Sequence, residues 1–137
     1  MDLLDMTTKL EKLLKEKNKR DNLPAEILSA AFDQQKEFIT DPARRKAAFV
    51  ARRSGKSFMI GIYLIYTALS KARIKCLYFG KTQDSARNVM WLHIIFNLLE
   101  RFDLKMGVDY KYNKNQQEIT FANGSMIKLT GADANDS

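Results

Sequence analysis

Residues 50–57 combine glycine, lysine and serine at a spacing that suits phosphate binding. They fit seven of the eight positions of the pattern Gly-x-x-x-x-Gly-Lys-Ser/Thr, with Val50 in place of the first glycine. Gly55 permits the backbone conformation that turns N–H groups toward an anion. Lys56 is placed to reach the β and γ phosphates, and Ser57 to offer its hydroxyl to Mg²⁺. The segment therefore predicts a site for a nucleotide's phosphates.

The segments on either side of this loop are those that such a site needs. Residues 47–51 form a short apolar run typical of a strand buried on both faces, and residues 56–71 contain no helix breaker except Gly61. A strand before the loop and a helix after it direct N–H groups and the positive end of the helix toward phosphate. The alternative is that Gly-Lys-Ser is a chance tripeptide at a helix start, which makes both flanking elements coincidences.

Apolar periodicity and turn residues divide the rest of the chain into helices and strands. We expect an amphipathic helix over 2–18 that ends at 22–24, a helix over 24–38, a strand over 74–79, a helix over 84–102, and strands over 118–122 and 126–130. Asn123-Gly124 favours a hairpin between the last two, because this pair tolerates positive φ. The order predicts an α/β fold of the P-loop NTPase type. Its βαβ core would have a largely parallel sheet, preceded by N-terminal helices and followed by a β-hairpin.

The formal charge of +7 is concentrated around the loop. Lys and Arg number 23 against 16 Asp and Glu, and residues 36–56 hold seven of the cations with only Glu37 and Asp41 against them. One use for such a patch is contact with a nucleic-acid backbone. In the alternative interpretation, Arg52 and Lys56 bind ATP and the remaining cations form a solvated turn. Tyr110–Lys114, expected as a loop, is a weaker candidate for nucleic-acid contact.

Composition excludes several classes of protein. The single cysteine cannot form an internal disulfide, and with one histidine there is no Cys/His cluster for zinc, so a reducing, intracellular setting is expected. The longest apolar run, residues 58–69, is shorter than the roughly 20 residues that cross a bilayer. The N-terminus lacks the pattern of a signal peptide. We expect no membrane association.

The loop resembles that of the large terminase subunits of tailed bacteriophages, the ATP-driven motors that package DNA into capsids. Their phosphate loop commonly lacks the first glycine and carries arginine ahead of Gly-Lys-Ser/Thr, as residues 51–57 do. The resemblance spans about residues 30–135. It includes Gln34–Phe38, similar to the family's adenine-contacting glutamine motif, Leu77–Thr82 followed by Ala86, similar to its second strand and loop, and Phe121–Leu129, similar to the hairpin before its acidic metal-binding motif.

The resemblance implies roles for individual residues. Gln35 would read adenine, with Gln34 as the alternative if the register slips by one, since an amide both donates and accepts. Arg52 and Lys56 would be catalytic, Arg52 by adding positive charge near the γ phosphate. Ser57 would hold Mg²⁺. The residues expected to bind nucleotide are Gln35, Ala51, Arg52, Arg53, Ser54, Gly55, Lys56 and Ser57.

The resemblance also implies that the chain is an incomplete domain. Residues 1–23 would form an N-terminal amphipathic helix, and 24–137 the N-terminal part of the P-loop ATPase domain, without the Walker B strand or the nuclease domain. Asp133 and Asp136 are expected to be loop residues. Alone, the chain would bind nucleotide weakly and be inactive.

The complete protein would couple ATP hydrolysis to packaging of double-stranded DNA. Its partners would be the portal protein and the small terminase subunit, and it would form an oligomeric ring in the cytoplasm of the bacterial host.

Two alternatives remain open. A superfamily 2 helicase-like ATPase also pairs an upstream glutamine with a phosphate loop, although its loop usually has threonine and a second glycine where this chain has Arg53 and Ser54. The other is a non-enzymatic basic module that binds DNA or a partner protein through residues 36–56, with a vestigial phosphate loop.

Overall fold

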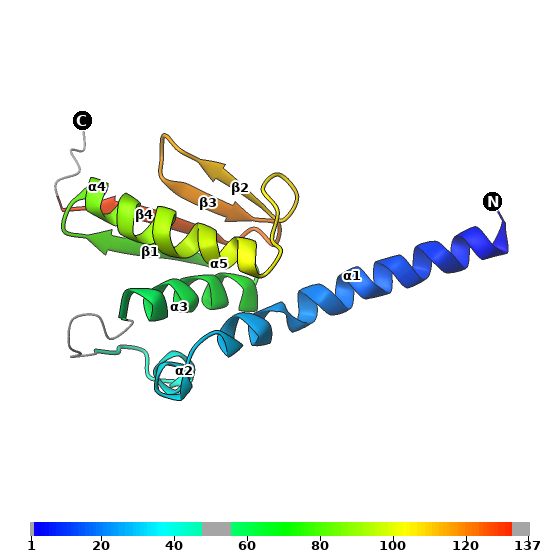
Figure 1. Cartoon of the computed structure of the whole chain (residues 1–137), viewed down its shortest axis with the longest axis horizontal. Helices are drawn as coiled ribbons and strands as arrows, with labels where there is room; N and C mark the ends of the chain where they lie inside the picture. Colours follow the sequence, from blue (N-terminus) through cyan, green and yellow to red (C-terminus); the bar gives the residue numbers. More distant parts are fainter. Residues whose placement is uncertain (1, 48–55, 133–137) are drawn as a thin grey trace.

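The computed structural model describes residues 2–47 and 56–132, without the side chains of residues 19–21. These residues form a mixed α/β body from which one long helix projects (Figure 1). The α/β class predicted from the sequence is confirmed. Of the expected strand at 47–51, only Ala47 is described, and it is exposed and outside any strand. The rest of that strand lies outside the described residues.

The described sheet has four strands in the order β1-β4-β3-β2. Their bounds are β1 Lys75–Gly80, β2 Tyr110–Asn113, β3 Glu118–Phe121 and β4 Met126–Gly131. Only β1 and β4 pair in parallel, with Tyr78 opposite Leu129, whereas both other pairings are antiparallel. The prediction of a largely parallel sheet is therefore wrong for the described residues. Short turns join β2 to β3 and β3 to β4, and a short turn permits only antiparallel pairing.

The hairpin predicted around Asn123-Gly124 is confirmed. Gly124 has φ +86°, a conformation in which a side chain is strained. The turn also caps the C-terminal end of helix α3 (Lys56–Ser70), which comes much earlier in the chain. Asn123 Nδ2 donates to the Ala68 carbonyl at 2.9 Å, and Ser125 Oγ donates to the Lys71 carbonyl at 2.8 Å. This contact fixes the end of α3 relative to the hairpin.

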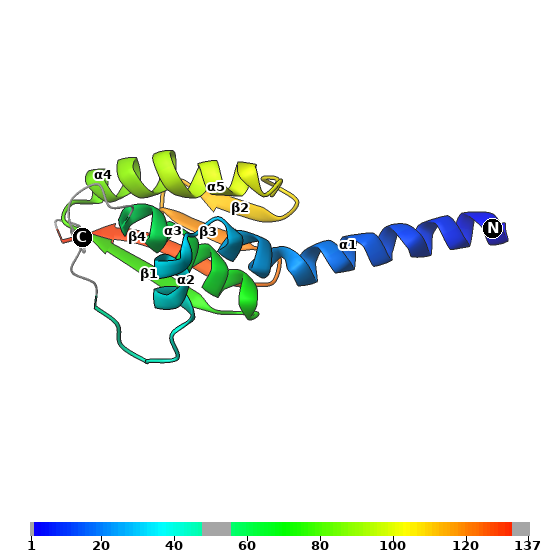
Figure 2. The same ribbon diagram turned by 60° about the horizontal axis from the view of Figure 1, so that its bottom comes forward.

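Helices cover one face of the sheet. The helix predicted over 84–102 is confirmed as a continuous run of α4 (Gln83–Ala86), the π-helical η1 (Arg87–Ile95) and α5 (Phe96–Arg101). It lies with α3 against the face that carries the buried residues of β4 and β3 (Figure 2). The opposite face is open at β1, where Leu77 and Phe79 are more than 60% exposed.

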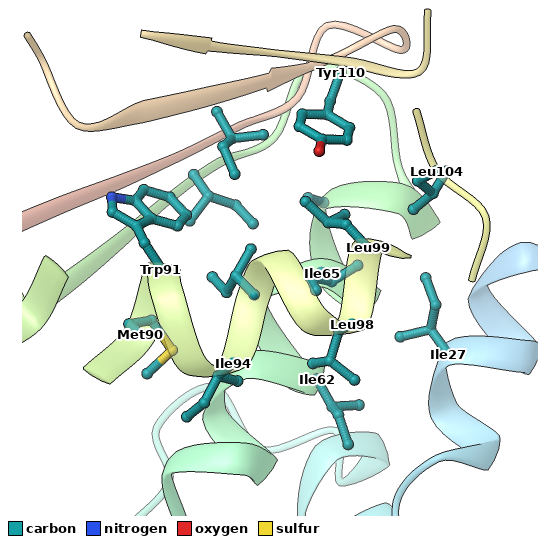
Figure 3. Packing of buried hydrophobic residues seen from close by; sticks show 14 of the residues in the cluster. Ile27, Ile62, Ile65, Met90, Trp91, Ile94, Leu98, Leu99, Leu104 and Tyr110 are labelled. Atoms are coloured by element: carbon teal, nitrogen blue, oxygen red, sulfur yellow. The ribbon is translucent and has the colours of Figure 1, made fainter. Parts of the chain in front are cut away.

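The core lies between α3, the α4–η1–α5 run and the sheet (Figure 3). Ile62 and Ile65 of α3 and Leu98 and Leu99 of α5 all belong to this core, and the four side chains are almost fully buried. Gly61 lies where a Cβ atom would collide with the Ile94 side chain, so only glycine permits this close approach of the helices. Other fully buried members include Met90, Trp91, Ile95, Ile119, Ile127 and Leu129.

The N-terminal helices differ from those expected. A single helix α1 (Leu3–Ser29) runs through Pro24, followed by α2 (Asp33–Thr40), so the predicted helix end at 22–24 is wrong. Proline removes a hydrogen bond and disfavours the helix locally. Leu23 and Ile27 on either side are 5% and 0% exposed, so their burial in the core favours the continuous helix. The expected boundary between 1–23 and 24–137 falls inside α1.

The segment expected as a loop before the hairpin is strand β2. Tyr110 lies opposite Phe121 of β3 and is 8% exposed, and the Tyr112 ring meets Phe96 edge-on with centroids 5.1 Å apart. Both tyrosines thus pack into the core, while Lys111 between them is exposed. The Tyr-Lys-Tyr-Asn alternation is a period-two signal that identifies such a strand.

Candidate nucleotide-binding site

The lysine of the phosphate-binding pattern begins helix α3. Lys56 is exposed, and Ser57 is half-buried in the first turn. The first turn of a helix presents unpaired N–H groups and the positive end of the helix dipole, both of which favour an anion. The other predicted residues of the loop, Ala51, Arg52, Arg53, Ser54 and Gly55, lie outside the described residues.

A cavity of about 450 Å³ lies beside Lys56. Its walls come from the end of α2, the segment 41–47 and the first two turns of α3, in the residues Phe38, Arg44, Lys46, Lys56, Met59, Ile60 and Tyr63. Among the described lining residues three are cations and none is a carboxylate, while the rest are apolar or aromatic. The volume is within the range of about 300–1,000 Å³ typical of small-molecule sites. The chemistry suits a ligand with an anionic part and a flat apolar part.

Lys46 connects the three elements that form this cavity. Its Nζ donates to the Ile39 carbonyl of α2 and to the Tyr63 hydroxyl of α3, both at 3.0 Å. The same Nζ lies 4.7 Å from the centroid of the Tyr63 ring and 5.7 Å from that of Phe38. Phe38 and Tyr63 meet edge-on with centroids 6.3 Å apart. Lys46 therefore holds the segment 41–47 against both helices.

A second cavity of about 350 Å³ shares Phe38 and Lys46 with the first. Its other lining residues are Gln34, Glu37, Asp41, Ala43, Arg45 and Ala47. Arg44 lines the first cavity and Arg45 the second, so the consecutive arginines serve different surfaces. The described cations of the basic patch thus line two adjoining cavities, and Lys46 is common to both.

The two glutamines of the predicted adenine motif lie in different surroundings. Gln35 is 4% exposed, and its Oε1 accepts a hydrogen bond from the Phe32 backbone N–H at 3.2 Å, which caps α2. Gln34 is exposed and lines the second cavity. The structure thus brings Lys56 and Ser57 to one end of α3, near the first cavity, and Gln34, not Gln35, to the adjacent one.

Sequence reasoning missed Phe38, Lys46 and Tyr63 as individual site residues. Lys46 was included only as one charge of the basic patch, and its partner Tyr63 is 17 residues further along the chain. Helical periodicity puts Tyr63 two turns after Lys56, hence on the same side of α3, and this is a signal that could have identified it.

The described residues also contain a lone thiol and side chains of the types that bind metals. Burial raises the pKa of the Cys76 thiol, which disfavours the thiolate needed for nucleophilic attack. In residues 2–47 and 56–132, no three His, Cys, Asp or Glu side chains gather in a way that could hold a metal ion. Asp133 and Asp136 lie outside the described residues.

Comparisons with protein-family models, with curated proteins and with solved structures found no match to this chain.

Each helix in the described part of the chain falls short of the length or apolar character that crossing a bilayer requires.

Proposed function

We propose that this chain is the ATP-binding portion of a P-loop ATPase, in which the cavity beside Lys56 receives the nucleotide. The observation that carries the proposal is the composition of that cavity. Lys56 lines it from the first turn of α3 together with Arg44 and Lys46, and the part of the lining that the structure describes contains no carboxylate. A polyphosphate carries several negative charges, so preorganised cations and a helix N-terminus favour its binding.

The apolar wall of the cavity complements the base and ribose of a nucleotide. Phe38 and Tyr63 offer ring faces or edges, and Met59 and Ile60 add aliphatic surface. Aromatic side chains stack on bases of any sequence, so this wall supplies affinity more than selectivity. Gln34, four residues before Phe38 in α2, lines the adjacent cavity and would supply the amide that reads adenine.

Mg²⁺ would enter with the nucleotide. The Ser57 hydroxyl, one residue after Lys56 in the first turn of α3, is the ligand this chain offers. Bound there, Mg²⁺ would supply positive charge that offsets the negative charge of the phosphates. Lys56 would bind and orient the phosphates, and Arg52 would add charge near the γ phosphate.

The resemblance to large terminase subunits supports a more specific proposal. In the complete protein this site would power packaging of double-stranded DNA, within an oligomeric ring that contacts the portal protein and the small terminase subunit in the bacterial host's cytoplasm. The parallel pairing of β1 with β4, the only such pair in the described sheet, is compatible with a P-loop NTPase arrangement. The described sheet is otherwise antiparallel, so the proposal rests on the site and the loop pattern.

The test is binding of a fluorescent ATP analogue to the chain and to Lys56→Ala. We expect the substitution to weaken binding by about tenfold or more, because a charged contact to phosphate is worth about 1.4 kcal/mol or more. Lys71→Ala is the matched control, since Lys71 is an exposed lysine just beyond the opposite end of α3. Equal binding by the wild type and Lys56→Ala would remove the proposal.

The second candidate is a basic module that binds DNA through the patch around α2. Arg45 favours it, because this exposed cation lines the second cavity and is not among the residues that line the first. If this function holds, Arg45→Ala weakens binding of a DNA duplex and flattens its dependence on salt, while ATP-analogue binding is unchanged. A nucleotide-only site predicts no effect of Arg45→Ala on either measurement.

A further inference from the structure

The first half of α1 exposes its apolar side chains, whereas the second half buries its own in the core. Leu3, Leu4, Met6, Leu10, Leu13 and Leu14 are between 47% and 79% exposed, whereas Leu23 and Ile27 are buried in the core. Figures 1 and 2 both show this half projecting away from the sheet and from α3. Isolated exposed leucines are ordinary, but a cluster of this size on one element indicates an interaction surface.

Most of these side chains share one side of the helix. Leu3 and Leu10 are seven residues apart, as are Met6 and Leu13, and the two pairs interleave at alternating steps of three and four. This is the spacing of the seam of a coiled coil, and Leu14 widens it into a stripe of about 100°. We call Leu3, Met6, Leu10, Leu13 and Leu14 the α1 stripe. Leu4 projects from a different side.

The α1 stripe cannot be covered by the chain's own core while α1 stays intact. The helix is continuous from Leu3 to Ser29, and Leu23 is already anchored against the body. At a rise of 1.5 Å per residue, the nine residues from Leu14 to Leu23 hold the stripe more than about 13 Å from that anchor. None of the described residues covers the stripe, which leaves it available to another molecule.

We propose that the α1 stripe is the docking site for the α1 stripe of a second copy of this chain, in antiparallel orientation. In the register that pairs the two stripes, Leu3 lies beside the partner's Leu13 and Met6 lies beside the partner's Leu10. Each stripe then meets one of the same composition, and four apolar layers form across the pair. The dimer is independent of nucleotide and of the proposed function.

Charge along the helix selects the antiparallel orientation. Residues 2–8 carry two carboxylates, Asp2 and Asp5, and no cation, whereas residues 9–18 carry four lysines against two glutamates. In this register residues 2–8 of each copy lie opposite residues 8–14 of the other, which carry Lys9 and Lys12 against Glu11, and the helix dipoles are opposed. A parallel pair would align like ends and put Lys17, which interrupts the seam, beside the partner's Lys17.

The first experiment is sedimentation equilibrium of the chain over micromolar concentrations. We expect self-association in the wild type, weakened about tenfold or more in Leu10→Glu/Leu13→Glu, because two charges then face the seam. Leu4→Glu is the control: Leu4 is 72% exposed but lies outside the stripe, so this variant should dimerise as the wild type does. Leu10→Ala/Leu13→Ala, which keeps helix propensity, should also dissociate. A monomeric wild type, or equal effects of Leu4→Glu and the double variants, would overturn the proposal.

The second experiment tests orientation, in a Cys76→Ser background. Oxidation of a mixture of Leu3→Cys chains and Leu13→Cys chains should give a disulfide-linked heterodimer, whereas Leu3→Cys alone should crosslink only weakly. Efficient crosslinking of Leu3→Cys to itself would show a parallel pair and contradict the proposal.

Discussion

The cavity end of the molecule and the helix–sheet core are held together in different ways. Around the first cavity, a single charged side chain connects three elements, because Lys46 Nζ reaches the Ile39 carbonyl, the Tyr63 hydroxyl and two rings. In the core, Trp91 and Ile62 are both 0% exposed and belong to one cluster of buried apolar side chains. Changes in the core should therefore act on stability, and changes at the cavity on ligand binding.

The largest effect on stability is expected at Trp91. It is 0% exposed and its ring packs against Phe96 and Tyr112, so Trp91→Ala should lower the free energy of unfolding by about 3–5 kcal/mol. Urea denaturation measures the loss. The neighbouring Leu92→Ala is the control: Leu92 is 55% exposed, and its substitution should cost no more than about 0.5 kcal/mol. Similar losses in the two variants would contradict the core assignment.

Unlike Trp91→Ala, Lys46→Met should lower ligand binding and have only a small effect on stability. Removing the ammonium leaves the Ile39 carbonyl and the Tyr63 hydroxyl without this donor, which should cost about 1 kcal/mol of stability. Binding of the ATP analogue should weaken about tenfold, because one of three cavity cations is lost. Lys111→Met, on the exposed side of β2, should change neither measurement. If Lys46→Met binds the analogue as tightly as wild type, Lys46 has no part in the site.

Tyr63→Phe removes one of the contacts that Lys46 makes and keeps the others. The ring that faces the ammonium is kept and only the hydroxyl that accepts from Nζ is removed, so we expect a loss of about 0.5–1 kcal/mol in stability. Analogue binding should fall by less than in Lys46→Met. A larger effect than that of Lys46→Met would indicate that Tyr63 contacts the ligand directly.

The smallest predicted effect is a pH dependence at Tyr110. Burial, helped by the negative charges of Asp109 and Glu100, raises its pKa above the ordinary value of 10. The unfolded state then loses this proton first as the pH rises, so the stability Tyr110 contributes is present below pH 10 and is lost above it. Denaturation of wild type and Tyr110→Phe between pH 8 and pH 11 should show the steeper decline in the wild type. Parallel curves would contradict the burial of this hydroxyl.

Local signals in the sequence were sufficient for much of the fold. The helices at Lys56–Ser70 and Gln83–Arg101, strand β1 and the Asn-Gly hairpin all follow from periodicity and turn chemistry within a few residues. Where prediction failed, a distant contact decided the outcome. Pro24 is accommodated because Leu23 and Ile27 on either side of it are buried in the core. The order and direction of the strands depend on pairing partners that no local pattern specifies.

The candidate site could be predicted only in part. Lys56 and Ser57 are identifiable because their motif is contiguous, and the capping role of Gln35 follows the local rule that a glutamine three residues into a helix bonds back to the N-cap. The cavity itself requires Phe38, Lys46 and Tyr63, which come from three elements and meet only in the folded chain. Its discovery needed the tertiary structure.

The most direct test of the proposed nucleotide site is its location by NMR during a titration with Mg·ATP. We predict that the amide signals of Phe38, Lys46, Lys56 and Tyr63 shift together and saturate, while those of Leu10 in α1 and Lys111 in β2 do not move. Absence of shifts up to millimolar Mg·ATP, or saturable shifts confined to residues away from the first cavity, would contradict the assignment of this cavity to a nucleotide.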